Sequence, residues 1–169
     1  MTDSANAVFI DGLRNAHAME KEALSIMQPQ LNRLEHYPEV SALLNRHIQE
    51  TETQLARLDQ IFEDCGESSS SIKDAAMSFG GTMAAVGNTL ASDEILKNSM
   101  ANLAFENFEI AAYVSLLVLA EEAGQASAVP LLQQNLDEER AMAGDIESGL
   151  PAVVRRFVSL SNSDQRADI

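Results

Sequence analysis

Five glutamates occupy positions of this chain where helical periodicity calls for apolar core residues. They are Glu20, Glu50, Glu106, Glu109 and Glu139, and they come from four separate helical segments. A buried, ionised carboxylate costs several kcal/mol unless it is paired with a cation or bound to a metal. Carboxylates that converge from four helices therefore favour a four-helix bundle with a two-metal centre in its interior.

The composition favours an all-α fold in a single domain. The chain is rich in Ala, Leu, Glu and Gln, contains only four Pro, and has no stretch in which β-branched and polar residues alternate. Its 169 residues, 46% of them hydrophobic, are enough to bury one sizeable core. We predict a bundle over residues 1–150 and a partly disordered C-terminal tail over residues 151–169.

Apolar residues at three- and four-residue spacing, together with turn residues, predict the helix boundaries. Pro38 suits the first turn of the second helix, Gly66 and Gly124 can end the second and third helices, and Ser92 is a candidate N-cap for the third. Pro151 is expected to close the fourth helix. The four helices expected on these grounds cover residues 4–27, 38–65, 93–123 and 126–149.

The segment 72–91 connects the two helical pairs and contains three glycines. Glycine lowers helix stability by about 1 kcal/mol per residue relative to alanine. We therefore expect a short, broken crossover helix whose small residues would permit close packing at a subunit interface.

The charge and the N-terminus bear on partners and location. A formal net charge of -15 and a pI near 4.4 argue against nucleic acid and anionic membranes as partners. The apolar run 110–120 is shorter than the roughly 20 residues needed to cross a bilayer, and the N-terminus lacks a basic segment followed by an apolar run. We expect a cytoplasmic protein. The single cysteine, Cys65, is interpreted as structural.

Glu106 and Glu109 lie three residues apart, so both can reach one ion from the same helical face. A Glu-x-x-Glu pair also occurs on solvated helix faces, and in isolation the surface interpretation would be preferred. The apolar neighbours Leu103, Phe105 and Tyr113 shift the balance toward metal binding. In the second helix the inward position is either Glu50 or Thr51, and in the fourth Glu139 is preferred to Glu138.

Several short stretches of the chain resemble a known family. They are Met19-Glu20-Lys21-Glu22, His47-Ile48-Gln49-Glu50-Thr51, Phe105-Glu106-Asn107-Phe108-Glu109-Ile110-Ala111 with Tyr113, and Leu131-Leu132 through Glu138 and Glu139. In order and spacing they are similar to the YciE/YciF type of ferritin-like bacterial stress proteins. The resemblance spans about residues 8–149. It implies a ferritin-like four-helix bundle, commonly dimeric, with a di-iron-type site that has Glu20, Glu50, Glu106, Glu109 and Glu139 as ligands.

The chain departs from related di-iron proteins of the rubrerythrin kind, in which a histidine follows the glutamates of the second and fourth helices by three residues. Thr53 and Met142 stand at those positions here, and neither is a good iron ligand. His47 could supply the nearest nitrogen, or it could be a core histidine that donates to a carboxylate. His17 is interpreted as a residue at the margin of the site or on the surface.

Two functions from different classes follow. An oxygen-rich site suits two iron or manganese ions, with iron preferred, in an oxidoreductase that oxidises Fe(II) or removes peroxide under stress, with oxygen or peroxide as the small-molecule substrate. Alternatively the chain is a helical structural or interaction protein whose core glutamates are protonated or paired with Arg14, Arg57 and Arg140. A homodimer is expected in either case. Tyr113 and Gln54 are expected to orient carboxylates by hydrogen bonds.

Overall fold

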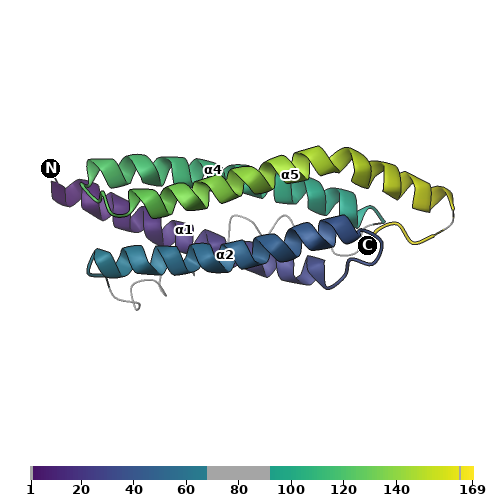
Figure 1. Ribbon diagram of the computed structural model, residues 1–169, viewed down its shortest axis with the longest axis horizontal. Coiled ribbons are helices and arrows are strands. Elements are labelled where there is room, and N and C mark those ends of the chain that lie inside the picture. The colour runs from purple at the N-terminus through teal and green to yellow at the C-terminus, as the bar shows by residue number, and fades with distance from the viewer. Residues whose placement is uncertain (1, 68–91, 164) are drawn as a thin grey trace.

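The computed structural model describes residues 2–67, 92–163 and 165–169, and in these residues all regular structure is helical. Four long helices form a bundle (Figure 1). The predicted all-α, four-helix architecture is confirmed, whereas the crossover helix predicted for residues 72–91 lies outside the described residues. The helices are α1 (Thr2–Leu31), α2 (Pro38–Asp64), α4 (Glu94–Glu122) and α5 (Val129–Asn162).

Each helix packs against two neighbours and runs antiparallel to both. Around the bundle the order is α1, α2, α5, α4, so α2 and α5 lie side by side although a third of the sequence separates them (Figure 1). α2 ends and α4 begins at opposite ends of the bundle (Figure 1). Apolar side chains from all four helices fill the ends of the interior, which leaves the middle for the polar residues described below.

The start of α2 and the ends of α2 and α4 follow the predicted turn chemistry. Pro38 occupies the first turn of α2. Gly66 and Gly124 have φ angles of 75° and 72°, in the left-handed region that glycine adopts without steric cost. The N–H of Glu67 donates to the carbonyl of Phe62 over 3.0 Å, which satisfies one of the free carbonyls at the end of α2.

The predicted N-cap of α4 is wrong. The residue before α4 is Asp93, not Ser92, and its side chain makes no capping hydrogen bond. The N–H of Ile95 instead donates to the carbonyl of Asp168 over 3.0 Å. A carbonyl of the C-terminal segment thus does the work that a capping side chain does elsewhere.

Two prolines lie inside helices that were expected to end near them. α1 continues past Pro29 to Leu31, and α5 continues past Pro151 to Asn162, so the prediction that Pro151 closes the fourth helix is wrong. Proline removes one helical hydrogen bond, but Pro151 is exposed and the apolar stripe continues beyond it. That stripe comprises Ile146, Leu150, Val153, Phe157 and Leu160, all buried or half-buried.

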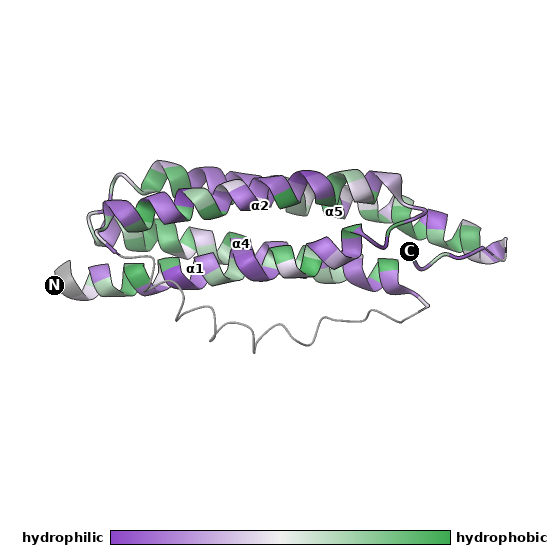
Figure 2. Cartoon of the chain, turned by 90° about the horizontal axis from the view of Figure 1, so that it is seen from below, coloured by the Kyte–Doolittle hydropathy of each residue, from purple (hydrophilic) through white to green (hydrophobic). Residues whose placement is uncertain are grey.

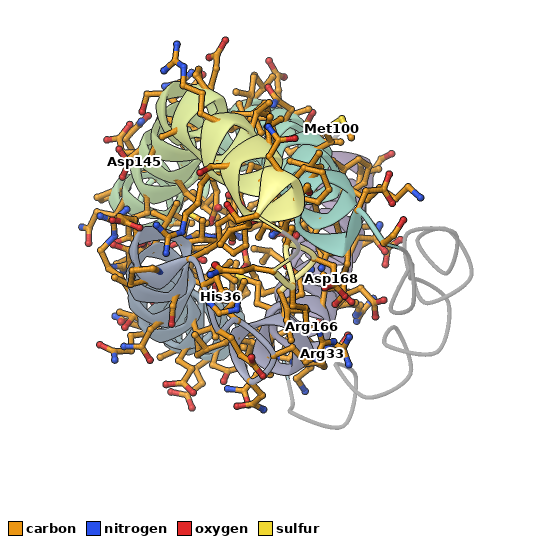
Figure 3. All side chains as sticks on the ribbon, turned by 90° about the vertical axis from the view of Figure 1, so that its right-hand side faces the viewer. Arg33, His36, Met100, Asp145, Arg166 and Asp168 are labelled. Carbon is orange, nitrogen blue, oxygen red and sulfur yellow. The ribbon has the colours of Figure 1, made fainter. Side chains whose placement is uncertain are left out.

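The last residues fold back onto the end of the bundle where α2 and α4 begin. The hydroxyl of Tyr37 donates to the carbonyl of Ala167 over 2.5 Å, and the N–H of His36 donates to the carbonyl of Ile169 over 3.3 Å. Ala167 and Ile169 are buried, which the polar composition of the segment did not indicate. Figure 3 looks onto this end of the bundle and labels His36, Arg166 and Asp168 there.

Within the described residues, α4 is the one helix long and apolar enough, by length and composition, to cross a membrane. Core helices of bundles meet the same criterion, and α4 packs against α1 and α5. It also carries Glu106 and Glu109 into the bundle interior. The other helices mix hydrophilic and hydrophobic residues along their length (Figure 2).

Candidate metal centre

Three helices bring four donor side chains together near the middle of the bundle. α2 supplies His47, α4 supplies Glu106 and Glu109, and α5 supplies Glu139; one donor atom from each lies within 4.8 Å of the others. All four residues are buried. Glu106 and Glu109 reach the same point because a three-residue separation places them one above the other on α4.

The carboxylates of this cluster are not satisfied by protein donors. Both oxygens of Glu109 and Oε1 of Glu139 lack a hydrogen-bond partner in the described part of the chain, whereas Oε2 of Glu139 lies 3.3 Å from Nε2 of His47. Native interiors pair nearly all buried polar atoms, so three unpaired carboxylate oxygens in one place are unusual. Such buried carboxylates are compensated either by protons or by a bound cation.

Glu20 joins the cluster from α1 through its charge. It is fully buried, and its Oε1 accepts a short hydrogen bond from the hydroxyl of Tyr113, while its Oε2 has no partner in the described part of the chain. Its charge interacts with those of Glu106, Glu109 and Glu139. The structure therefore brings a fourth buried carboxylate to the same centre.

Tyr113 links Glu20 to a polar chain that reaches the surface. Asn135 donates to the Tyr113 hydroxyl over 2.9 Å, and Arg57 donates to Oδ1 of Asn135 over 2.9 Å. Arg57 also binds both oxygens of Glu138, at 2.7 and 2.8 Å. The sequence indicated the role of Tyr113 but missed Asn135, although its place three residues after buried Leu132 was a usable signal.

His47 contacts carboxylates through both ring nitrogens. Its Nδ1 lies 3.1 Å from Oε2 of Glu50, and its Nε2 lies 3.4 Å from Oε2 of Glu106 and 3.3 Å from Oε2 of Glu139. Burial opposes the charged imidazolium, but the contacts with Glu106 and Glu139 prevail and raise the pKa of His47 to about 11. Without metal, His47 is therefore the one cation within the cluster.

Burial raises the pKa values of the acids around it. The pKa of Glu106 rises to about 7 because burial and the charge of Glu139 outweigh the contact with His47. Burial, with the charges of neighbouring glutamates, raises the pKa values of Glu20 and Glu109 well above their ordinary value. These shifts favour the protonated forms of the buried acids, so metal binding at this site would displace protons.

The two ambiguities left by periodicity are resolved by burial. Thr51 is the fully buried residue of its pair in α2, whereas the side chain of Glu50 is 30% exposed and contacts His47 and Arg46. Glu139 is fully buried, whereas Glu138 pairs with Arg57. Glu50 thus stands outside the group of four donors, and its role as a ligand stays a prediction. Gln54 donates to Glu138, not to one of the candidate ligands.

The proposed arginine partners do not reach the core glutamates. Arg14 pairs with Asp11 and Glu67, Arg57 with Glu138, and Arg140 with Asp137. Pairing of the core acids with these three arginines is therefore excluded in the described part of the chain.

His17, Thr53 and Met142 are not members of the four-donor group. His17 is buried, so its interpretation as a surface residue is wrong, and its Nε2 lies 3.3 Å from Oδ1 of Asp59. Thr53 is exposed and donates to the carbonyl of Gln49, and Met142 is buried. His47 is then the nitrogen donor present in the cluster.

Comparison with known proteins places the chain in a family. A family model described as "Domain of unknown function (DUF892)" matches residues 4–159. The chain belongs to this family. It is 32% identical to the protein YciF of Escherichia coli over 142 residues, which cover 79% of this chain and 82% of YciF. The resemblance to the YciE/YciF type is thereby confirmed.

Solved structures of similar proteins agree with the fold. The crystal structure of the E. coli stress protein YciF matches with a TM-score of 0.74 and 27% identity, covering 90% of this chain and 98% of that one. A protein from Xanthomonas campestris matches with a TM-score of 0.78 and 28% identity, covering 94% of this chain and 99% of the other. Family membership thus supports the bundle on which the candidate centre is built.

Proposed function

We propose that this family member is a ferritin-like protein that binds two metal ions, iron rather than manganese, in the centre of its bundle. The observation that carries the proposal is the buried group of His47, Glu106, Glu109 and Glu139, whose donor atoms lie within 4.8 Å of one another. With Glu20 the centre contains four carboxylates, and two divalent ions would neutralise them. A single imidazolium would not.

The donor set fits iron or manganese. Carboxylate oxygens with one imidazole suit these ions better than copper, and a structural zinc site would use more sulfur or nitrogen. Glu106, Glu109 and Glu139, with Glu20, would hold the ions, and His47 would bind through Nε2. Glu50 then accepts the Nδ1–H of His47 and keeps the ring oriented, as acceptors beside ligating histidines generally do.

The bound metals would supply redox chemistry toward oxygen or peroxide, which makes the protein an oxidoreductase of the ferroxidase or peroxidase type. The chain itself contributes a buried cluster of carboxylates, and burial favours their protonated forms when no metal is bound. Tyr113 keeps Glu20 in place. The description of E. coli YciF as a stress protein supports a role in a bacterial stress response, and we propose that this role is cytoplasmic.

Adjacent glutamates of α5 provide a matched test. Protein purified without chelator is analysed for metals and then titrated with Fe(II) under argon, for wild type, Glu139→Gln and Glu138→Gln. Glu139 lies in the cluster, and Glu138 pairs with Arg57. We expect nearly two irons per chain and a raised melting temperature in wild type and in Glu138→Gln, and reduced occupancy in Glu139→Gln.

The alternative is a helical structural or interaction protein with a degenerate site. The missing histidines at the positions of Thr53 and Met142 favour it. No bound metal, together with equal melting temperatures in Fe(II), Mn(II) and chelator, would exclude the metal proposal and leave this function. Equal metal loss in both glutamine variants would show that the cluster is not the binding site.

We further propose that the chain forms a homodimer through the outward face of α4. Between Lys97 and Glu121 the charged residues are Glu106 and Glu109, and both point inward. Phe108, Val114 and Val118 on the outward face are more than 40% exposed, at 44%, 42% and 55%. For copies that each carry a charge of -15, an uncharged face is where association meets least repulsion.

A further inference from the structure

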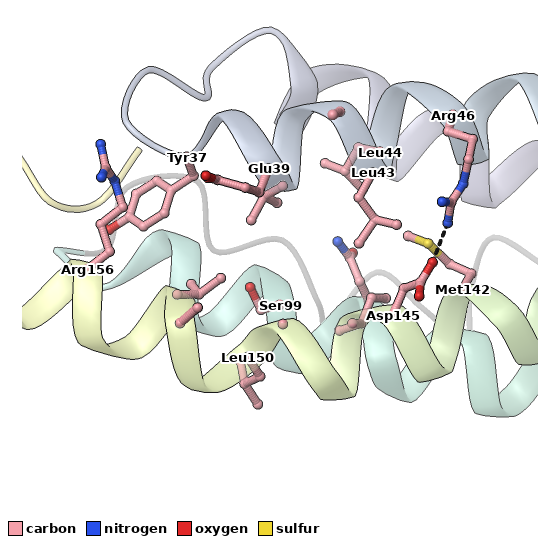
Figure 4. A pocket seen from close by; sticks show the side chains of 17 residues that line it. Tyr37, Glu39, Leu43, Leu44, Arg46, Ser99, Met142, Asp145, Leu150 and Arg156 are labelled. Atoms are coloured by element: carbon pink, nitrogen blue, oxygen red, sulfur yellow. Dashed lines mark hydrogen bonds and ion pairs between the residues drawn. The ribbon is translucent and has the colours of Figure 1, made fainter.

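A large pocket opens between α2 and α5 at the end of the bundle where the C-terminal segment packs (Figure 4). Its volume is about 940 Å³, within the range of about 300–1,000 Å³ typical of small-molecule sites. Apolar residues of both helices form most of its walls: Val40, Leu43, Leu44, Met142, Ile146, Leu150 and Val153. One of them, Met142, lies one helical turn beyond Glu139.

Ser99, Asn102, Arg46 and Asp145 of the pocket wall already have partners. The hydroxyl of Ser99 donates to the carbonyl of Ile95 over 2.8 Å, and Asn102 exchanges two hydrogen bonds with Gln30. Arg46 binds Asp145 over 2.6 Å at one end of the pocket (Figure 4). The middle of the pocket therefore suits an apolar ligand, because an additional polar group there would find no free partner in the described wall.

Arg156 lies at the opposite end, beside Tyr37 (Figure 4). Its Nε donates to the carbonyl of His36, which fixes the guanidinium at the rim. No ion pair of Arg156 is present among the described residues. Glu39, also at the rim, lies in the first turn of α2, where the helix dipole stabilises its charge. Arg156 is thus the lining cation that can bind an anionic group.

We propose that this pocket binds a straight-chain fatty acid, with its carboxylate on Arg156 and its alkyl chain along the apolar wall toward Met142. The shape and chemistry agree with such a ligand: an elongated apolar interior, one cation at the far end and satisfied polar groups between. A second copy of the chain is a poor occupant, because Glu39 and Asp145 at the rim would face another protein of charge -15. The bound alkyl end would lie next to the carboxylate cluster.

Two glycines of α5 allow a matched test of occupancy. Gly149 lines the pocket and Gly144 does not, and a Cβ added at either position meets no heavy atom within 4 Å. Leucine at position 149 would therefore fill pocket space without a backbone clash. Leucine at 144 makes the same change on the exposed surface of the same helix.

Two ligands, dodecanoate below its micelle concentration and neutral dodecan-1-ol, are titrated separately into the full chain in chelator. Binding is followed by calorimetry and by displacement of anilinonaphthalene sulfonate. We expect one site per chain, affinity reduced about tenfold or more in Gly149→Leu, and unchanged affinity in Gly144→Leu. Arg156→Gln should weaken dodecanoate about tenfold and leave dodecan-1-ol unchanged, and Arg155→Gln should change neither.

Several results would overturn the proposal. These are no saturable binding to wild type, equal losses in the two leucine variants, or equal effects of Arg156→Gln on acid and alcohol. A change of oligomeric state in Gly149→Leu without a change in dodecanoate affinity would assign the pocket to a second copy. Melting temperatures of each variant show that it is folded. Because the titration is done without metal, its outcome is independent of the metal proposal.

Discussion

Replacing Glu106 by glutamine should make the metal-free protein more stable at pH 8 and should weaken its response to metal. The pKa of this acid rises from an ordinary value of 4.5 to about 7. At about 1.36 kcal/mol per pKa unit, its ionisation in the folded state costs about 3 kcal/mol. This free-energy cost already includes the favourable contact of the ionised Glu106 with His47. Glutamine keeps the size of the side chain and removes the charge.

The pH dependence follows from the direction of the shifts. Between pH 4.5 and about 7 the folded protein holds a proton on Glu106 that the unfolded chain has lost. The free energy of unfolding therefore falls as the pH rises through this window. His47 acts in the same direction, because its raised pKa stabilises the fold fully below pH 6.5, and that stabilisation is lost as the pH rises toward about 11. Metal-free protein should lose stability with rising pH.

The measurement is urea unfolding followed by helical circular dichroism, in chelator, at pH 5 and pH 8. The advantage of Glu106→Gln over wild type should be larger at pH 8 than at pH 5 by about 2–3 kcal/mol. The control is Glu52→Gln, an identical change at an exposed position of α2. Its effect should be nearly the same at both pH values. Added Fe(II) should stabilise wild type and Glu52→Gln much more than Glu106→Gln.

The reasoning would be refuted by a Glu106→Gln variant that is destabilised at pH 8 and neutral at pH 5. Such a result would mean that the ionised carboxylate is well compensated in the metal-free fold. An equal pH response of Glu106→Gln and Glu52→Gln would likewise show that the acid is not held in a costly environment.

Three further predictions test the surroundings of the centre. Tyr113→Phe removes the donor to Glu20 and the acceptor of Asn135, so urea unfolding should show a loss of about 1–3 kcal/mol; no loss would mean that water replaces the hydroxyl. Tyr37→Phe removes the hydrogen bond to the carbonyl of Ala167 and should cost about 1 kcal/mol and speed amide exchange of the last residues; unchanged exchange would contradict a tail held by this bond. Val118→Asp on the outward face of α4 should convert the proposed dimer to monomer in light scattering, whereas Val158→Asp on α5 should not; a dimer in both variants would exclude the α4 face.

The fold was predictable because most local signals agree with the tertiary structure. Periodic apolar residues, Pro38 in the first turn of α2, and glycines 66 and 124 mark helices and their ends in the expected way. The N-cap prediction for α4 failed because a distant segment supplies the hydrogen bond that a local capping residue was expected to make. Asp168 satisfies the N-terminus of α4, and no pattern near Ser92 could reveal that partner. α5 passes Pro151 because apolar residues on both sides of it belong to one stripe.

The candidate site was predictable as a set of inward acids, but not in its internal arrangement. Periodicity places Glu106, Glu109 and Glu139 in the core because each interrupts an otherwise apolar stripe. It could not choose between Glu50 and Thr51, which are neighbours near the boundary of the inward face. Only the packing of α2 against α5 decides which one is buried.

The order of residues in α2 bears on the missing nitrogen ligands. In the rubrerythrin pattern a histidine follows the glutamate by three residues, whereas here His47 precedes Glu50 by three. The order of histidine and glutamate within one helical turn is thus reversed. The imidazole of His47 lies in the cluster, and the carboxylate of Glu50 contacts Nδ1 of His47 and the side chain of Arg46. If His47 binds metal, Glu50 supports it from outside, and Glu50→Gln should lower metal affinity about 10–100-fold without removing the site. With this order the cluster has one nitrogen donor among carboxylates. Such a donor set suits iron or manganese and differs from that of a centre with two histidines.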